Sequence, residues 1–262
     1  MINSQLGRQS GCFHKGEKMT NRKTMILTGA SRGIGHATVK KFSAEGWEVL
    51  TCSRDDIPRE CQRDPNWSYH VPVDLAHAQS VEDFIEKALN FLGGRPLHAL
   101  VNNAAMSPKL PHNVRLGCFN GNIDDWRHVF ELNFFAPLAL ARGFADSLKK
   151  EKGTIVNITS IAGHEIHPFA GSPYSVSKAA LSSLTRELAA ELAPFGIRVN
   201  AIAPGEIATD MIGPEYEMLL ERIPMRRFGK AEEVASAVFN LCSDEFAYVT
   251  GSEIFVTGGQ HL

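Results

Sequence analysis

The sequence contains few cysteines, and none of them is spaced for a zinc site or a disulfide framework. Its 262 residues include five cysteines and no Cys-x-x-Cys pair, so reduced thiols are the simplest interpretation. No apolar run approaches the ~18 residues that a membrane-spanning helix requires, and residues 1–18 lack the apolar segment of a signal peptide. These absences predict a cytoplasmic protein that does not associate with a membrane.

Charge of either sign is not in excess. The chain has 27 Lys and Arg against 29 Asp and Glu, a formal net charge of −2, which gives no electrostatic reason to expect nucleic acid as a partner. Hydrophobic residues make up 44% of the chain, enough for a sizeable core. His164 and His167 lie close together without a ligand set around them, so we expect loop or rim residues and no metal site.

Strand-like and helix-like segments alternate along the chain. Apolar runs typical of strands are 23–28, 47–52, 67–72, 97–102, 153–159, 197–202 and 252–256, and helical patterns occupy 33–45, 81–91, 123–150, 173–193 and 231–242. This alternation predicts an α/β fold, a single-domain doubly wound (Rossmann-type) parallel sheet of about seven strands with helices on both faces. We expect the domain to occupy residues 19–262 and residues 1–18 to form a disordered N-terminal extension. Pro137 should bend the longest helix.

Tyr174 and Lys178 are four residues apart in a helical segment. Positions i and i+4 share one face of a helix, so the phenol and the ammonium should point into the same space. A neighbouring cation favours the phenolate, which should lower the pKa of Tyr174 from its usual value of about 10 and make it a proton donor and acceptor. Taken alone, the pair has a surface contact on an amphipathic helix as its alternative interpretation.

A glycine-rich turn joins the first predicted strand to the first predicted helix. Residues 28–35 read Thr-Gly-Ala-Ser-Arg-Gly-Ile-Gly. Glycines at such a turn let the backbone approach a pyrophosphate, and the helix N-terminus supplies free N–H groups and a positive dipole end. We therefore predict that this turn binds a dinucleotide.

The end of the second predicted strand bears on the choice between NAD and NADP. An acidic residue there would bind the ribose 2′-hydroxyl of NAD, whereas this chain has Ser53 and Arg54, with Arg32 available in the glycine turn. Guanidinium groups match a 2′-phosphate, so NADP(H) is favoured. Asp55 and Asp56 follow directly and keep NAD(H) as the alternative. A solvated loop cation is the alternative interpretation of Arg54.

In their order along the chain, these motifs resemble those of the short-chain dehydrogenases/reductases, with a 3-oxoacyl reductase-like pattern. The resemblance extends from about residue 24 to 259 and includes an Asn-Asn-Ala-Ala segment at 102–105, where the family usually has Asn-Asn-Ala-Gly. It implies a catalytic tetrad of Asn133, Ser160, Tyr174 and Lys178. Ser160 would polarise the substrate carbonyl, Tyr174 would transfer the proton, and Lys178 would also hold the nicotinamide ribose. Asn133 would anchor a water that leads to Lys178.

The resemblance also implies a set of cofactor contacts. Asp74 is expected at the adenine, Asn102 and Ala104 beside the adenosine ribose, and Ile207 and Thr209 at the carboxamide. The implied cofactor-binding residues are Gly29, Ser31, Arg32, Gly33, Ile34, Gly35, Ser53, Arg54, Asp74, Leu75, Asn102, Ala104, Tyr174, Lys178, Pro204, Gly205, Ile207 and Thr209. Because Ser160 precedes Tyr174 by one residue more than the commonest family spacing, the loop 164–172 should bulge over the substrate.

The predicted activity is hydride transfer between NADP(H) and a ketone or secondary alcohol, including 3-oxoacyl compounds. An NAD-dependent sugar or polyol dehydrogenase is one alternative, and a catalytically silent NADP-binding regulator is another. Segments 106–121 and 211–228 should line the substrate cleft. The resemblance implies a homotetramer packed through 123–150, 173–193 and the C-terminal segment. Phe134, Phe135 and Leu138 fit either helix packing of that kind or the monomer core.

Overall fold

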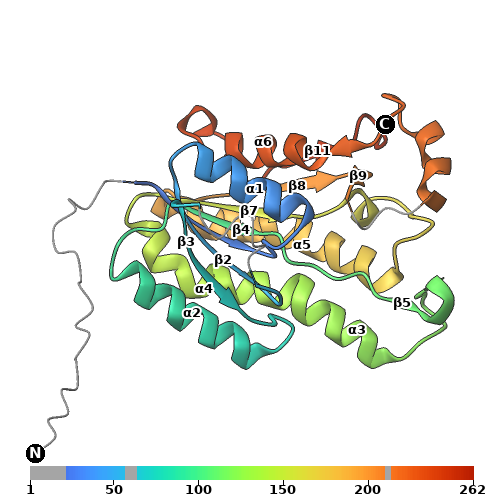
Figure 1. Cartoon of the computed structure of the whole chain (residues 1–262), viewed down its shortest axis with the longest axis horizontal. Coiled ribbons are helices and arrows are strands. Elements are labelled where there is room, and N and C mark those ends of the chain that lie inside the picture. Colours follow the sequence, from blue (N-terminus) through green and yellow to red (C-terminus); the bar gives the residue numbers. More distant parts are fainter. Residues whose placement is uncertain (1–21, 57–63, 210–213) are drawn as a thin grey trace, which may run out of the picture.

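The central element of the protein is a parallel sheet. The computed structural model describes residues 22–56, 64–209 and 214–262, so the predicted extension 1–18 lies outside the described residues. Seven strands pair in parallel in the order β11-β8-β7-β4-β1-β2-β3 (Figure 1). They are β1 (Thr24–Thr28), β2 (Glu48–Ser53), β3 (Trp67–Pro72), β4 (Ala99–Asn102), β7 (Thr154–Ile158), β8 (Arg198–Pro204) and β11 (Glu253–Val256).

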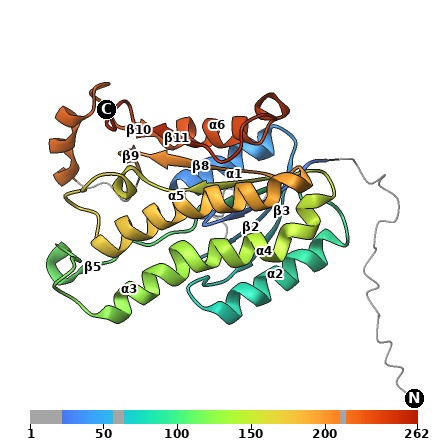
Figure 2. The same ribbon diagram turned by 180° about the vertical axis from the view of Figure 1, so that it is seen from behind.

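Helices cover both faces of this sheet, which confirms the predicted α/β fold. The longer helices are α1 (Gly33–Ala44), α2 (Ala78–Leu92), α3 (Ile123–Phe130), α4 (Ala136–Lys149), α5 (Ser172–Leu192) and α6 (Ala231–Leu241). Helices α1 and α6 lie on one side, and α2, α4 and α5 lie on the other (Figures 1 and 2). Successive residues of a strand face opposite sides of the sheet. Met25 and Leu27 therefore belong to the core under α1 and α6, and Ile26 belongs to the core under α2 and α4.

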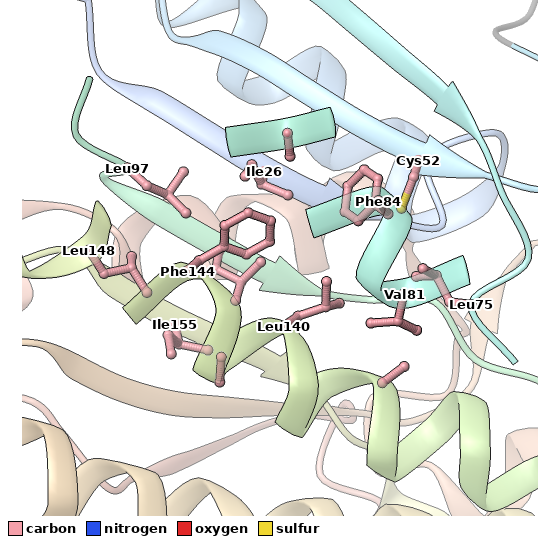
Figure 3. Close-up of a cluster of buried hydrophobic side chains, with 14 of the residues drawn as sticks. Ile26, Cys52, Leu75, Val81, Phe84, Leu97, Leu140, Phe144, Leu148 and Ile155 are labelled. Carbon is pink, nitrogen blue, oxygen red and sulfur yellow. The ribbon is translucent and has the colours of Figure 1, made fainter. Parts of the chain in front are cut away.

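The core under α2 and α4 is built from large apolar side chains. Phe84 of α2 and Phe144 of α4 are fully buried and meet edge to face, with ring centroids 6.3 Å apart (Figure 3). Ile26 and Ile155 of the sheet pack against the same cluster. Because burial of each such side chain is worth about 1.5–3 kcal/mol, this layer fixes both helices on the sheet.

The strand order reverses between β1 and β4. From β1 the chain builds outward through β2 and β3, then returns to place β4 on the other side of β1 and continues through β7, β8 and β11. At such a reversal, the loops after neighbouring strands diverge and leave a crevice at their carboxyl ends. The fold therefore places the turns after β1, β2, β4, β7 and β8 around one crevice.

The predicted long helix is divided by a wide turn. Helix α3 ends at Phe130, a π-helical turn occupies Glu131–Phe135, and α4 begins at Ala136. The main-chain N–H of Ala136 reaches back five residues to the carbonyl of Glu131. Pro137 follows directly and has no N–H to donate. The irregularity that the sequence predicts at this proline is thus a single widened turn that precedes it.

Shorter elements surround the open end of the sheet. The predicted cleft segment 106–121 contains the antiparallel pair β5 (Lys109–Leu110) and β6 (Val114–Arg115). Strand β9 (Ile207–Ala208) pairs in parallel with β10 (Gly229–Lys230), and a 3₁₀ helix spans Pro214–Arg222. The second predicted cleft segment, 211–228, begins outside the described residues. Within the described ranges, no helix has the length and apolar character needed to cross a bilayer.

Candidate functional site

A cavity of about 530 Å³ lies at the carboxyl ends of the central strands. The turns after β1, β2, β4, β7 and β8 contribute to its wall, as the reversal of strand order requires. It brings together all the site residues that the sequence predicts except Asn102 and Asn133. The predicted cofactor and catalytic residues, which span more than half of the chain, therefore share one enclosed space.

The glycine turn has a backbone conformation that depends on its glycines. Gly29 and Gly33 have positive φ angles of 73° and 55°, which side chains with a Cβ seldom adopt. A Cβ on Gly35 would lie 2.0 Å from the carbonyl oxygen of Gly29, so only glycine lets α1 begin this close to the turn. Arg32, the N-cap of α1, makes no side-chain cap hydrogen bond. The first N–H groups of the helix thus remain available, and the residues present fit a dinucleotide.

Asn102, the last residue of β4, and Asn103, which follows it, make different contacts. Asn102 does not line the cavity: it is buried, and its Nδ2 donates to Oδ1 of Asn157 at 2.8 Å. Asn103 does line it, and its Nδ2 donates to the carbonyls of Thr28 and Gly29 at 3.0 and 2.9 Å. The cofactor contact expected of Asn102 stays a prediction. Asn103, which the sequence analysis missed, holds the glycine turn in place.

The end of β2 presents residues of both charges to the cavity. Ser53, Arg54 and Asp55 all line it, and the last two are exposed. The Ser53 hydroxyl donates to the main-chain carbonyl of Asp55 at 2.6 Å and contacts Nε2 of His70 at 3.3 Å. These contacts fix the backbone of the turn while the side chains of Arg54 and Asp55 extend from it.

Ser160, Tyr174 and Lys178 meet in the middle of the cavity. Tyr174 and Lys178 lie one turn apart on α5, and Tyr174 forms a hydrogen bond with Ser160, which follows β7. Nζ of Lys178 lies 5.6 Å from the centroid of the Tyr174 ring and donates to the carbonyl of Ile158 at 2.6 Å. The three side chains therefore lie close together, and their catalytic roles stay a prediction.

Burial dominates the electrostatics of this group. Lys178 is 2% exposed, and desolvation lowers its pKa to about 7. Burial raises the pKa of Tyr174, the hydrogen bond from Ser160 opposes that rise, and the negative charge of Glu206 adds to it. The predicted lowering of the Tyr174 pKa by Lys178 is thus wrong in this structure, because the cost of burying a phenolate exceeds the effect of its neighbours.

Asn133 lies in the π-helical turn, where its side chain is fully buried and does not line the cavity. Its Oδ1 accepts from the N–H of Met106 at 2.9 Å, and its Nδ2 donates to the Met106 carbonyl and to Oγ of Ser177, both at 3.0 Å. The side chain therefore ties the segment after β4 to α5. Its predicted role as the anchor of a water stays a prediction.

His167 and Glu206 form a buried pair in the cavity wall that was not predicted from the sequence. His167 is 5% exposed instead of lying at the rim, and its Nε2 lies 2.7 Å from Oε1 of Glu206. Both residues line the cavity. His164, in contrast, is exposed and lies 3.1 Å from Oε2 of Glu253. The 39 residues that separate Glu206 from His167 leave no local pattern that pairs them.

Comparison with known protein families and curated relatives points to one group of enzymes. A family model described as enoyl-(acyl carrier protein) reductase matches residues 29–261. Protein FixR of Bradyrhizobium diazoefficiens is 52% identical over 92% of this chain and 87% of its own length. A 3-oxoacyl-[acyl-carrier-protein] reductase of Synechocystis is 34% identical over 89% of this chain and 95% of its own length.

A solved structure agrees with these relatives. An oxidoreductase of the short chain dehydrogenase/reductase family from Brucella ovis, in complex with a partially ordered NAD, is 45% identical to this chain. The similarity covers 90% of this chain and all of that one, with a TM-score of 0.76. The fold of this chain is therefore similar to that of a protein whose crystal structure contains NAD.

Proposed function

The chain belongs to the short-chain dehydrogenase/reductase family, and we propose that it interconverts a ketone and a secondary alcohol with Tyr174 as the proton donor and acceptor. The family and the relatives support NAD(P)-dependent oxidoreduction of a carbonyl or alcohol group. The observation that carries the assignment of residues is the convergence of Ser160, Tyr174 and Lys178 in the cavity that the glycine turn also lines.

When bound, the nicotinamide cofactor supplies or accepts the hydride. The residues of the chain then handle the oxygen and its proton. Ser160 and Tyr174, already hydrogen-bonded to each other, would both contact the substrate oxygen, and the Ser160 hydroxyl would orient it. Tyr174 would donate the proton during reduction and accept it during oxidation.

Lys178 would replace the proton that Tyr174 gives up. Because burial brings the pKa of Lys178 to about 7, its amine both gains and loses a proton near neutral pH, which is the condition for efficient relay. In its charged form, it also favours the phenolate that Tyr174 becomes after reduction. The same ammonium would bind the ribose hydroxyls beside the nicotinamide.

For the cofactor, we favour NADP(H). Arg32 and Arg54 both line the cavity next to Ser53, and two guanidinium groups with a hydroxyl suit a 2′-phosphate. Asp55 lines the same wall and supports NAD(H) as the alternative, as does the NAD in the Brucella ovis structure. Relative affinities for the two reduced cofactors, measured by nicotinamide fluorescence, distinguish them.

We further propose self-association as a homotetramer through the helices of 123–150, helix α5 and the C-terminal segment. Phe135 is 47% exposed at the start of α4, and Val176 on α5 is 47% exposed, so apolar surface remains on these two helices. Phe134 and Leu138 are only partly buried, which fits packing between subunits. Light scattering at several protein concentrations tests this, and a monomer throughout would contradict it. The cytoplasmic location stays a prediction.

The test of the activity is a panel of ketones and secondary alcohols, including 3-oxoacyl thioesters and polyols, assayed with each cofactor. Turnover of a ketone with NADPH or NADH, lost on removal of the Tyr174 hydroxyl, is the expected result. Tight cofactor binding without turnover of any compound would instead favour a regulator. Turnover confined to polyols with NAD would favour the alternative dehydrogenase.

A further inference from the structure

Glu206 places a buried carboxylate in the wall of the cavity. Its side chain is 5% exposed, and it follows β8 between Gly205 and Ile207, which line the same space. Among the described residues, its hydrogen-bond donors are Nε2 of His167 at 2.7 Å and Nε2 of Gln260 at 3.3 Å, and both contact Oε1. The lone pairs of Oε2 are therefore left for a group that enters the cavity.

The protein provides this carboxylate with no charged partner at hydrogen-bonding distance among the described residues. Nδ1 of His167 accepts hydrogen bonds from the N–H groups of Phe169 and Ala170 at 3.1 and 3.0 Å. A nitrogen that accepts two hydrogen bonds carries no proton, so the proton of the neutral ring lies on Nε2 and is donated to Glu206. Gln260 is neutral as well. Because a buried carboxylate is costly unless donors satisfy it, the site is complementary to a further donor.

Glu206 acts on the part of the cavity where the reaction would occur. Its negative charge raises the pKa of Tyr174, and charge effects of this kind fall off with distance. Its partner His167 belongs to the loop that joins Ser160 to Tyr174. The carboxylate therefore shares the wall of one cavity with Ser160 and Tyr174, which would hold the substrate oxygen.

Two further features indicate which donor fits. The rings of Phe169 and Tyr216 lie 4.6 Å apart and line the cavity next to His167, where they offer apolar faces to C–H groups. The donors that already contact Oε1, the ring of His167 and the amide of Gln260, are neutral. Hydroxyl groups are the neutral donors that ketone and alcohol substrates carry, so a hydroxyl is the donor that the proposed substrate class supplies.

We infer that Glu206 is a specificity residue, which accepts a hydrogen bond from a hydroxyl group on the carbon next to the reacting carbon of the substrate. This inference rests on the proposed function and narrows its substrate class to hydroxy ketones and vicinal diols, including sugar-like polyols. A carbonyl oxygen or a carboxylate at that position would place an acceptor against Oε2 and be rejected. Short 3-oxoacyl thioesters would be poor substrates because the carbon next to their reacting carbonyl is a methylene, which has no hydrogen-bond donor.

A set of closely matched small ketones tests the inference with the full-length protein. Hydroxyacetone carries the donor, methoxyacetone has a similar inductive effect without it, and acetone lacks the oxygen. Hydrogen bonds to charged groups contribute about 1.5–3 kcal/mol, so kcat/KM for hydroxyacetone should exceed that for methoxyacetone by about 10- to 150-fold. Comparable values for the two would overturn the inference, while their turnover would leave the proposed function standing.

Variants assign the preference to one side chain. Glu206→Gln keeps the shape of the side chain. Its amide oxygen should take the place of Oε1, which accepts from His167 and Gln260, and its NH2 group should take the place of Oε2, so the ratio of kcat/KM for hydroxyacetone to that for methoxyacetone should come close to one. Glu217→Gln makes the same change of charge on an exposed residue that does not line the cavity, and it should keep the ratio of the wild type. Equal losses for both ketones in Glu206→Gln would overturn the specificity role and indicate a structural one.

Two other outcomes separate the possibilities. If aminoacetone is preferred to hydroxyacetone, the donor is an ammonium and the assignment of a hydroxyl is wrong. If no ketone is turned over while NADH or NADPH binds, both the proposed function and this inference fail. Should Glu206→Gln not fold, the comparison of hydroxyacetone with methoxyacetone in the wild type decides the matter alone.

Discussion

The ammonium of Lys178 lies 5.6 Å from the centre of the Tyr174 ring, yet its short hydrogen bond goes to the main-chain carbonyl of Ile158. The lysine is therefore anchored to strand β7, one turn along α5 from the phenol. This anchoring keeps a buried amine in the cavity at a fixed distance from the proposed proton donor. Removal of either side chain should consequently affect different properties.

Tyr174→Phe removes only a hydroxyl and should preserve the fold. We expect kcat to fall by about 10²–10⁴-fold, the usual contribution of a general acid or base, while cofactor affinity changes little. Steady-state kinetics with a ketone substrate, together with fluorescence titration of NADPH and NADH, measure the two quantities. Near-normal turnover in this variant would show that another group supplies the proton.

Lys178 should make the stability of the protein depend on pH. Burial lowers its pKa to about 7, whereas a lysine in the unfolded chain keeps its ordinary value of about 10.4. Between these values the unfolded state binds more protons, so the free energy of unfolding should rise with pH by about 1–2 kcal/mol between pH 7 and 8.5. Urea unfolding at several pH values measures the slope.

Lys178→Met removes the titrating amine and is the matched variant for this measurement. In it, the free energy of unfolding should rise less steeply with pH. His70 and His98 have pKa values lowered below 6.5, so their contribution is largely complete at pH 7. Burial raises the pKa of the Cys52 and Cys242 thiols, which would reduce stability at still higher pH, and the measurement therefore stops at 8.5. An identical slope in both proteins would contradict the assignment to Lys178.

Arg54→Ala tests the proposed site for the 2′-phosphate. Loss of a hydrogen bond to a charged group should weaken NADPH binding by about 1.5–3 kcal/mol and leave NADH binding almost unchanged. Arg127→Ala, a change at an exposed arginine of α3 outside the cavity, is the control for the loss of positive charge. Equal weakening of both cofactors in Arg54→Ala would reject the assignment and favour NAD(H).

Phe144→Ala should destabilise the domain without touching the site. The ring is fully buried against Phe84 between α4 and the sheet, and truncation of a buried phenylalanine costs about 3–5 kcal/mol. The midpoint of urea unfolding should fall accordingly, while the folded fraction keeps its KM for substrate. The same change at Phe119, whose side chain is fully exposed, should have little effect on stability.

The fold was accessible to sequence analysis because each of its elements has a local signal. Apolar runs such as 97–102 contain buried strands, and the predicted glycine turn does join β1 to α1. The division of the long helix shows the limit. Pro137 predicts an irregularity in the helix. Its position and form, a turn in which the Glu131 carbonyl accepts from the N–H of Ala136, depend on the packing of α3 and α4.

The site was predictable to the extent that its residues belong to contiguous motifs. Ser160, Tyr174 and Lys178, which belong to such motifs, lie close together. Which of Asn102 and Asn103 contacts the glycine turn depends instead on the direction of each side chain at the end of β4. The pairing of His167 with Glu206 joins two loops at the end of the sheet. The pKa of Tyr174 likewise depends on burial, which no spacing of residues encodes.

The widened turn at 131–135 constrains the number of residues between α3 and α4, and not only the types of residue found there. Helix α3 lies against α5, while α4 lies against α2 and the sheet, so the two halves present their apolar sides in different directions. Removing one residue would rotate one half by about 100° relative to the other and expose what is now interior. Substitutions here should consequently be tolerated far better than single-residue deletions, and relatives of this protein should vary here in residue type while keeping the count.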